Sequence, residues 1–283
     1  MTQANTIAFC ADDYGLAPGV SLAIRNLIDQ GRLSATSCMT GSPHWPEAAQ
    51  AIRPLTGKAH IGLHITLSDQ RPLTLMPKTA PNGKLPKIEK LIIDSHLGRI
   101  DRDEIRGEIT AQVNAFTTHF GRPPDYLDGH QHCHTLPLIR DMVLEVWAGP
   151  MARHGWVRNC WESPLGVLSR GIDVARALII GGLGLGMLRR MKRLGVPHNA
   201  SFRGIYDLTD RVPFPELVKK FLADPQPHTL MMVHPGFVDD ALKAVDPLTD
   251  QREREYAYLA SDQFAEALDK RGLRLAKLFD PLP

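Results

Sequence analysis

Carboxylate and imidazole side chains follow several short apolar runs of this sequence. The run 7–11 ends in two adjacent carboxylates, Asp12 and Asp13, and the run 229–233 ends in His234 and a Pro-Gly pair. Adjacent carboxylates suit a division of work in hydrolysis, where one binds a cation and the other stays free as a general base. An Asp pair can equally cap the next helix, so its chemistry depends on what lies beside it.

Histidines supply the other half of this chemistry. Alternation along the run 60–67 places His64 on the face opposite Ile61 and Leu63. We expect Gly62 to leave space beside His64, through which a ligand or ion could approach the backbone. A lone histidine at such a position can also be a hydrogen-bonded core residue.

The densest polar cluster lies in the segment 126–134. Strand alternation there would place Asp128, His130, His132 and His134 on one side. Three charged imidazoles would repel one another, so the cluster favours neutral imidazoles bound to a cation, with Asp128 orienting one of them. The alternative is a solvated, histidine-rich turn.

The elements that must position these residues alternate along the chain. Turn signals and apolar runs predict strands at Thr6–Cys10, Ala35–Met39, His60–Leu67, Tyr126–His130, Gly155–Arg158, Thr229–Val233 and Leu273–Phe279. Helical periodicity predicts helices at Gly19–Gln30, Asp101–Gly121, Leu136–Val146, Phe214–Leu222 and Arg252–Lys270, and Asp101 with Glu104 resembles a capping box. This alternation predicts an α/β protein with a mostly parallel sheet, either open or closed into a barrel. In both architectures the carboxyl ends of the strands gather at one rim.

Four motifs, in this order, resemble the YdjC-like carbohydrate deacetylases, the group that includes chitooligosaccharide deacetylase and the hopanoid-associated HpnK proteins. They are ADDYG at 11–15, IGLHITL at 61–67, LDGHQHCHTLP at 127–137 and HPG at 234–236. The resemblance implies a distorted (β/α) barrel of mostly parallel strands, similar to that of polysaccharide deacetylases. It also implies hydrolysis of an N-acetyl group on an amino sugar or short N-acetylated oligosaccharide, with release of acetate.

The same resemblance implies roles for individual residues. Asp13, His64 and His130 would bind one divalent cation at the mouth of the barrel. Asp12 would be the general base, and His234 would be the acid for the leaving amine. The remaining members of the cluster, Asp128, His132 and His134, would contact the ligands or the substrate, or be structural. Ligand type alone does not identify the metal: zinc, iron, manganese or cobalt suit the set, and the resemblance adds magnesium, so we expect Mg²⁺ or Zn²⁺.

Two other functions remain open on the residues alone. A metal-dependent phosphoesterase also uses Asp and His clusters, although no phosphate-binding GxxxxGK[ST] loop is present. A non-catalytic sugar- or metal-binding protein would keep the pocket without turnover. The spare carboxylate of Asp12 beside Asp13 argues against it, because a binder needs no base.

Composition limits the partners. Hydrophobic residues make up 43% of the 283 residues and charged residues 23%, and the net charge is +2, which gives no footprint for nucleic acid. No signal peptide is readable, so we expect a cytoplasmic protein with four packing cysteines, and a homodimer as the default. No linker divides residues 1–283, so a single domain is expected, with a substrate-specific insertion around 160–200.

The segment 177–188 is uncharged but too short to span a membrane, so no transmembrane segment is expected. Its four glycines predict a buried helix end or a mobile connection. The alternative is an apolar rim that meets a lipid-linked substrate or a partner subunit.

Overall fold

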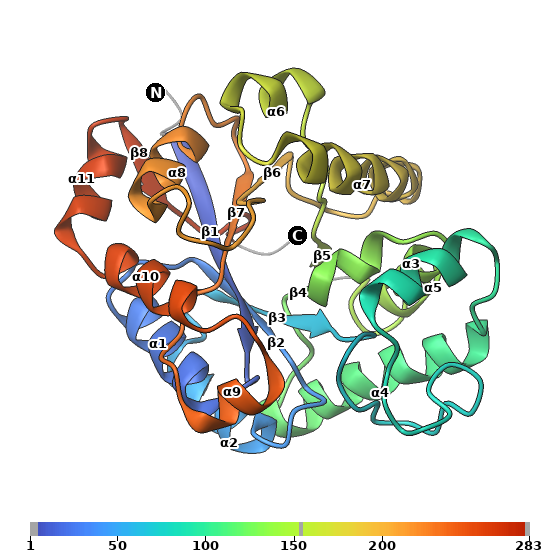
Figure 1. Ribbon diagram of the computed structural model, residues 1–283. Helices are drawn as coiled ribbons and strands as arrows, with labels where there is room; N and C mark the ends of the chain where they lie inside the picture. The colour runs from blue at the N-terminus through green and yellow to red at the C-terminus, as the bar shows by residue number, and fades with distance from the viewer. Residues whose placement is uncertain (1–4, 153–154, 281–283) are drawn as a thin grey trace.

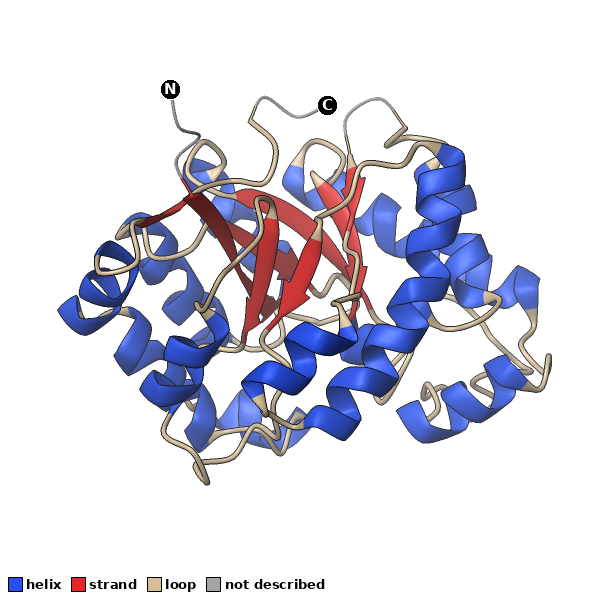
Figure 2. Ribbon diagram, turned by 90° about the horizontal axis from the view of Figure 1, so that it is seen from above, coloured by secondary structure: helices blue, strands red, loops and turns tan. Residues whose placement is uncertain are grey.

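A parallel β-sheet forms the centre of the computed structural model, which describes residues 5–152 and 155–280 (Figure 1). The strands lie in the order β5-β4-β3-β2-β1-β7-β6, and β8 pairs with the first residues of β1. Every recorded strand pair is parallel, and the sheet curls inside a layer of helices (Figure 2). The strands are β1 (Asn5–Tyr14), β2 (Ala35–Cys38), β3 (His60–Ile65), β4 (Tyr126–Gly129), β5 (Trp156–Val157), β6 (Ser201–Arg203), β7 (Thr229–Val233) and β8 (Leu273–Leu275).

The sheet has a different apolar cluster on each face. Alternate residues of β1 separate between them: Ile7 and Phe9 belong to the large cluster beneath the helices, whereas Ala8 and Cys10 belong to a smaller cluster. Because side chains alternate along a strand, the smaller cluster marks the inner face of the curled sheet. Its members are small on β1 and aromatic on β4 and β5, where the Tyr126 and Trp156 rings stack at 4.0 Å.

The curled sheet has two edges, β5 and β6, and asparagine side chains join the segments beside them. Asn159 and Asn199 are fully buried, and each donates its amide NH₂ to the other's backbone carbonyl, at 3.2 and 2.8 Å. The Asn199 side chain also accepts from the Asn159 N–H at 2.7 Å. These bonds satisfy backbone groups that an open edge would leave unpaired.

Most helices cover the outer face. The helices are α1 (Pro18–Asp29), α2 (Trp45–Ile52), α3 (Ile88–His96), α4 (Arg102–Phe120), α5 (Ile139–Trp147), α6 (Pro164–Arg170), α7 (Val174–Leu194), α8 (Phe214–Phe221), α9 (Asp240–Val245), α10 (Asp250–Leu259) and α11 (Asp262–Asp269), with 3₁₀ turns η1 (Arg53–Leu55) and η2 (His130–Thr135). Helix α6 and the first turns of α7 instead pack against the smaller, inner cluster through Val167 and Ala177. Asp101 caps α4 as predicted, accepting from the N–H groups of Asp103 and Glu104. The capping box is incomplete, because the Glu104 carboxylate instead accepts from the backbone N–H groups of Lys78 and Thr79.

The prediction of a helix end or a mobile connection at 177–188 is wrong. The segment lies within the 21-residue helix α7. Two of its four glycines serve close packing. A Cβ at Gly184 would lie 2.6 Å from the carbonyl carbon of Cys160, and one at Gly186 would lie 2.3 Å from the Arg140 guanidinium. The packing gained at these contacts offsets the low helix propensity of glycine.

Other elements also differ from prediction, and the short helices α2, α3, α6 and α9 were not predicted. The three-residue strand β6 was missed because it is shorter than the apolar runs that identify strands. The helix predicted at Arg252–Lys270 is divided into α10 and α11, which are separated by Ala260 and Ser261. In the described part of the chain, no helix is both long enough and apolar enough to cross a membrane.

Candidate metal centre

A β-bulge brings both adjacent carboxylates to one site. The register of β1 against β2 shifts between Ala11 and Tyr14, and Asp13 has a left-handed backbone with φ of 68°. In a regular strand Asp12 would share the inner face with Cys10, and Asp13 would point toward the helices. The extra residue of the bulge re-aims the Asp13 side chain, so both carboxylates serve the end of the same strand.

Asp13, His64 and His130 lie together at the carboxyl ends of β1, β3 and β4. Asp13 Oδ1 is 3.4 Å from His64 Nε2 and 3.1 Å from His130 Nδ1, and the three donor atoms all lie within 4.8 Å of one another. Asp13 and His64 are buried and His130 is half-buried, so the group has one side toward solvent. One carboxylate and two imidazoles leave open positions in a divalent cation's coordination shell.

His64 is oriented by Asp128. The His64 Nδ1 atom is 2.7 Å from Asp128 Oδ1, which leaves Nε2 facing Asp13. Burial acts to lower the pKa of His64, but the negative charges of Asp128 and Asp12 raise it to about 10. The ion-free pocket therefore attracts a proton to His64. A divalent cation would satisfy the same carboxylates and displace that proton, so the donor set fits a metal ion.

Arg252 holds the other oxygen of Asp13. Its Nη2 donates to Asp13 Oδ2 at 2.6 Å and to Asp246 Oδ2 at 2.7 Å, and the guanidinium is almost fully buried. Burial would raise the pKa of Asp13, but Arg252 and the neighbouring imidazoles keep it well below its usual range. Asp13 is therefore ionised, with Oδ1 directed at the two histidines.

Asp12 forms a buried two-point ion pair with Arg158. The Arg158 Nη1 and Nη2 atoms donate to Asp12 Oδ2 and Oδ1 at 2.7 and 2.6 Å. Burial alone would raise the pKa of Asp12, but Arg158 lowers it well below its usual range, so Asp12 is a carboxylate at neutral pH. Arg158 is also 2.5 Å from Asp128 Oδ2, which links Asp12 to the residue that orients His64.

Cys10, Asp12 and Asp128 also place ligand atoms close together, but they do not form a second metal site. Arg158 Nη2 contacts all three, at 3.0 Å from Cys10 Sγ, so its positive charge stands where an ion would. Burial raises the pKa of Cys10 to about 12, which keeps the thiol protonated and a poor ligand.

His234 directly follows β7, and the charges of Asp13 and Asp12 act on its imidazole. Its backbone N–H donates to Glu255 Oε2 at 2.5 Å, and no protein group within the described residues pairs with the buried Nδ1 atom. Burial lowers the pKa of His234, against the opposing charges of Asp13 and Asp12, so its imidazole is neutral at pH 7. Burial also raises the pKa of Glu255 to about 7.

The histidine-rich segment does not continue as a strand, so the expected alternation is wrong beyond Gly129. Gln131 and His132 have φ of 50° and 59°, and the chain turns through η2. His132 then lies 3.7 Å from Cys160 Sγ, and His134 Nε2 lies 3.1 Å from the Arg158 carbonyl oxygen.

Burial, followed by the nearby Arg158 charge, lowers the pKa of His132 to about 3 and that of His134 well below its usual range. Only His130 of this segment reaches Asp13. Asp128 orients His64 rather than a histidine of its own segment.

Gly62 also differs from expectation. A Cβ there would lie 2.4 Å from the Tyr126 ring, so the space beside His64 holds an aromatic side chain rather than a ligand. The phenol oxygen of Tyr126 lies 2.9 Å from Ser37 Oγ, and Ser37 donates to Asp128.

Sequence reasoning missed three residues of the site. Arg158 is the last residue of a predicted strand, and that position was the available signal. Ser37 lies inside a predicted strand and Arg252 begins a predicted helix, where nothing distinguishes either from an ordinary structural residue.

Comparisons with known proteins cover almost the whole chain. Residues 6–270 match the family described as YdjC-like protein. A chitooligosaccharide deacetylase of Enterobacter sp. (strain 638) is 27% identical over 270 residues, and one of Yersinia pestis (strain Pestoides F) is 31% identical over 273 residues. Each alignment covers 95% of this chain and 96% of the relative.

Two solved structures share the fold. One is a protein of Enterococcus faecalis V583, provisionally described as a cellobiose-phosphate cleavage protein, with a TM-score of 0.75, 21% identity and coverage of 99% of this chain and 100% of that one. The other is the Bc1960 peptidoglycan N-acetylglucosamine deacetylase, with a TM-score of 0.50, 11% identity and coverage of 99% and 89%. These likenesses confirm the predicted fold, in which the parallel sheet curls into a half-barrel similar to that of polysaccharide deacetylases.

Proposed function

This chain belongs to the YdjC-like protein family, and on that premise we propose that it is a metal-dependent hydrolase that removes an N-acetyl group from an amino sugar or short oligosaccharide. The observation that carries the proposal is the convergence of Asp13, His64 and His130, with the separately held carboxylate of Asp12 beside them. The names of the two relatives support the substrate class. A lipid-linked sugar and a homodimer stay predictions.

The proposed division of work follows from how each carboxylate is held. Arg252 leaves one oxygen of Asp13 free for a cation, whereas Arg158 binds both oxygens of Asp12 and keeps it away from that position. A divalent cation, Mg²⁺ or Zn²⁺, would supply polarisation of the amide carbonyl and a more acidic water. Asp12, ionised at neutral pH, is the group available to accept the water proton.

His234 is the proposed donor to the leaving amine. Because its resting imidazole is neutral, His234 must first take up a proton, and the proton that Asp12 accepts from water is a sufficient source. Water then adds to the acyl carbon, the C–N bond breaks, and the products are acetate and the protonated amine. The balance requires no other reactant.

A two-metal phosphoesterase is less well supported. Its second ion would need a second group of carboxylates beside the first, and the only such group among the described residues is filled by Arg158. A binding protein would not need Asp12 in a separate, ionised state.

The test is acetate release from N-acetylated chitooligosaccharides by protein that has been stripped of metal and then reloaded with zinc, magnesium, manganese or cobalt. Asp12→Asn should retain the ion and lose turnover, whereas His64→Ala should lose the ion and turnover. Elemental analysis measures the ion, and acetate release measures turnover. Full activity of Asp12→Asn would refute the base assignment. Sugar binding without acetate release would favour the binding protein, and phosphate release from an aryl phosphate would favour the phosphoesterase.

A further inference from the structure

Helices α6 and α7 present apolar side chains to solvent. They contact each other, and Figure 1 shows α6 at the top and α7 at the upper right of the molecule. Leu165 on α6 is 79% exposed and Ile179 on α7 is 67% exposed, and Leu168 and Leu178 are exposed beside them. Soluble proteins do expose single leucines, but several on two packed helices form a patch that usually meets another surface.

The same two helices carry an excess of basic residues. Residues 164–194 contain six arginines and lysines and one acidic residue, Asp173, although the whole chain has a net charge of only +2. Three of the six are paired: Arg176 with Asp173, Arg170 with Glu162 and Arg190 with Asp141. Among the residues that the structure describes, the exposed Arg189, Lys192 and Arg193 have no acidic group within 4.0 Å.

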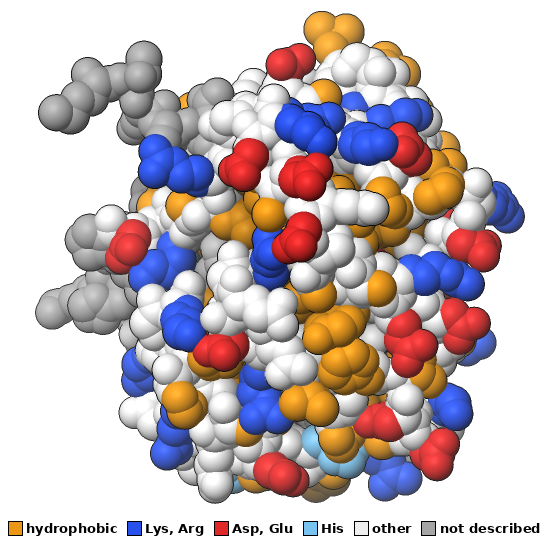
Figure 3. Space-filling view, turned by 90° about the vertical axis from the view of Figure 1, so that its left-hand side faces the viewer, with side chains coloured by type: hydrophobic (Ala, Val, Ile, Leu, Met, Phe, Trp, Pro, Cys, Tyr) orange, Lys and Arg blue, Asp and Glu red, His pale blue; other side chains and the backbone are white. Residues whose placement is uncertain are grey.

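By contrast, acidic and basic side chains mix across the face over α8, α10 and α11 (Figure 3).

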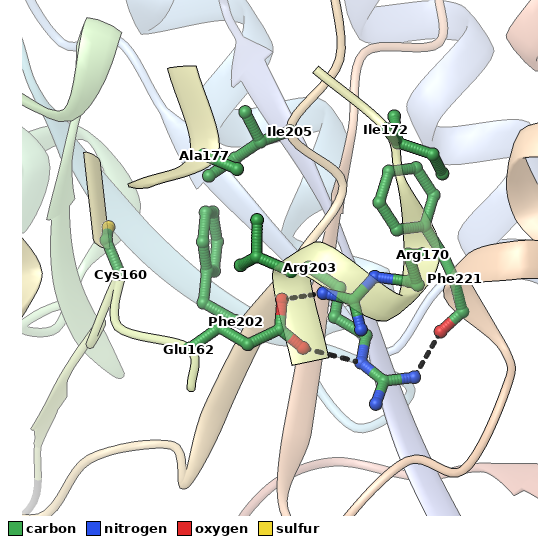
Figure 4. A pocket seen from close by; sticks show the side chains of 10 residues that line it. Cys160, Glu162, Arg170, Ile172, Ala177, Phe202, Arg203, Ile205 and Phe221 are labelled. Carbon is green, nitrogen blue, oxygen red and sulfur yellow. Dashed lines mark hydrogen bonds and ion pairs between the residues drawn. The ribbon is translucent and has the colours of Figure 1, made fainter. Parts of the chain in front are cut away.

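This surface is held firmly on the body of the protein. Beneath α6, the Glu162 carboxylate faces the guanidinium groups of both Arg170 and Arg203 (Figure 4). Gly184 of α7 packs directly on the backbone of Cys160. The exposed leucines therefore belong to a fixed surface rather than to a loose segment that could fold back and cover them.

We propose that α6 and α7 form a docking surface for an anionic phospholipid bilayer. Leu165, Leu168 and Ile179 would enter the interface. The unpaired cations in the last turns of α7 would contact the lipid phosphates, since apolar burial and charge attraction act together in interfacial helices. A second copy of this chain fits less well. A two-fold contact places the same patch on both partners, so the interface would collect the unpaired arginines and lysines of both copies with no unpaired acidic group from this patch. The inference does not depend on the deacetylase proposal.

The test is co-sedimentation of the purified protein with vesicles of phosphatidylcholine alone or mixed with phosphatidylglycerol. We expect partitioning onto the mixed vesicles that weakens with salt, and little onto the neutral ones. Lys192→Glu with Arg193→Glu should reduce partitioning by about 25-fold or more at low salt, because each cation near such a surface contributes about fivefold. Leu165→Ser with Ile179→Ser should reduce it by about tenfold.

The matched control removes exposed apolar side chains elsewhere. Leu75 and Ile93 are also exposed, but nearby lysines are already paired, such as Lys90 with Asp94 at 2.5 Å. Leu75→Ser with Ile93→Ser should partition like the wild type, and unchanged thermal unfolding midpoints verify that every variant folds.

Three results would overturn the proposal: no partitioning, equal partitioning onto both vesicle types, or a wild-type dimer that Leu165→Ser with Ile179→Ser converts to monomer without any vesicle binding. The last result would assign the surface to a second copy of the chain.

Discussion

Arg158 is the residue on which the charge balance of the site depends most. Its guanidinium is fully buried and contacts two buried carboxylates, Asp12 and Asp128. Arg158→Met keeps an apolar side chain of similar length against the Phe202 ring, which lies 5.6 Å from the guanidinium carbon, and removes only the charge and the donors. Asp12 then loses its cationic partner, and Asp128 keeps only the imidazolium of His64.

Removing one partner of a buried ion pair costs about 3–5 kcal/mol. We therefore expect Arg158→Met to lose about 3–5 kcal/mol of unfolding free energy at pH 7 in metal-free protein, measured by urea denaturation. The matched control is Arg106→Met. Arg106 pairs with Glu145 at 2.9 Å, but the side chains are 41% and 46% exposed, so its loss should stay within about 1 kcal/mol.

The pH dependence gives a second signature. In the wild type, the lowered pKa of Asp12 contributes stability above its unfolded pKa, and this contribution is lost as the pH falls through the folded pKa. In Arg158→Met, burial should raise the pKa of the same carboxyl above its unfolded value. Protonation of Asp12 then recovers part of the variant's lost unfolding free energy as the pH falls from 7 toward 4. The difference in unfolding free energy between wild type and variant should therefore decrease over that range. A loss no larger than that of Arg106→Met, or a difference that increases with acid, would refute the reasoning.

Three other outcomes follow from the geometry. Because neighbouring carboxylates raise the pKa of His64 to about 10, cation binding must displace its proton, and the apparent zinc affinity measured by calorimetry should rise about tenfold per pH unit from 6 to 8; a flat profile would contradict this. In metal-free protein the stability from the charged imidazole is present below about pH 6.5 and lost as the pH rises toward 10. Arg252→Gln should weaken zinc binding by about 10–100-fold, because the loss of the guanidinium frees the Asp13 carboxylate to rotate. Arg252→Lys should partly restore zinc binding. Unchanged zinc affinity in Arg252→Gln would assign the arginine a purely structural role. Gly184→Ala should lower the unfolding free energy and the thermal midpoint, because its Cβ would lie 2.6 Å from the backbone of Cys160. Gly182→Ala has open space around it and should raise the unfolding free energy by about 1 kcal/mol. If both variants changed the unfolding free energy equally, α7 would be free to shift.

Prediction from sequence succeeded where a pattern is local. The strands at 229–233 and 126–129 were found because an apolar run and a turn signal bound each of them. The cap at Asp101 was found for the same reason, since an N-cap depends on residues within one turn. Helix α7 was misjudged because the use of its glycines depends on Cys160 and Arg140, which the helix pattern does not contain.

The candidate site divides in the same way. The meeting of Asp13, His64 and His130 was implied by the family resemblance, and it agrees with the rule that the carboxyl ends of parallel strands share one rim. Their roles as ligands remain a prediction. The expectation that the later histidines join them was wrong, because η2 turns away from the strand direction after Gly129.

The sequence by itself determined which chemical groups stand at the strand ends, since hydrophobic alternation and turn residues act over a few positions. Only the tertiary structure decided which charge faces which. Arg158 and Arg252 reach their carboxylates across 146 and 239 residues of chain, and the bulge that turns Asp13 inward depends on pairing with a neighbouring strand. Burial then sets the pKa of each group, because desolvation and the nearest opposite charge exist only once the chain is folded.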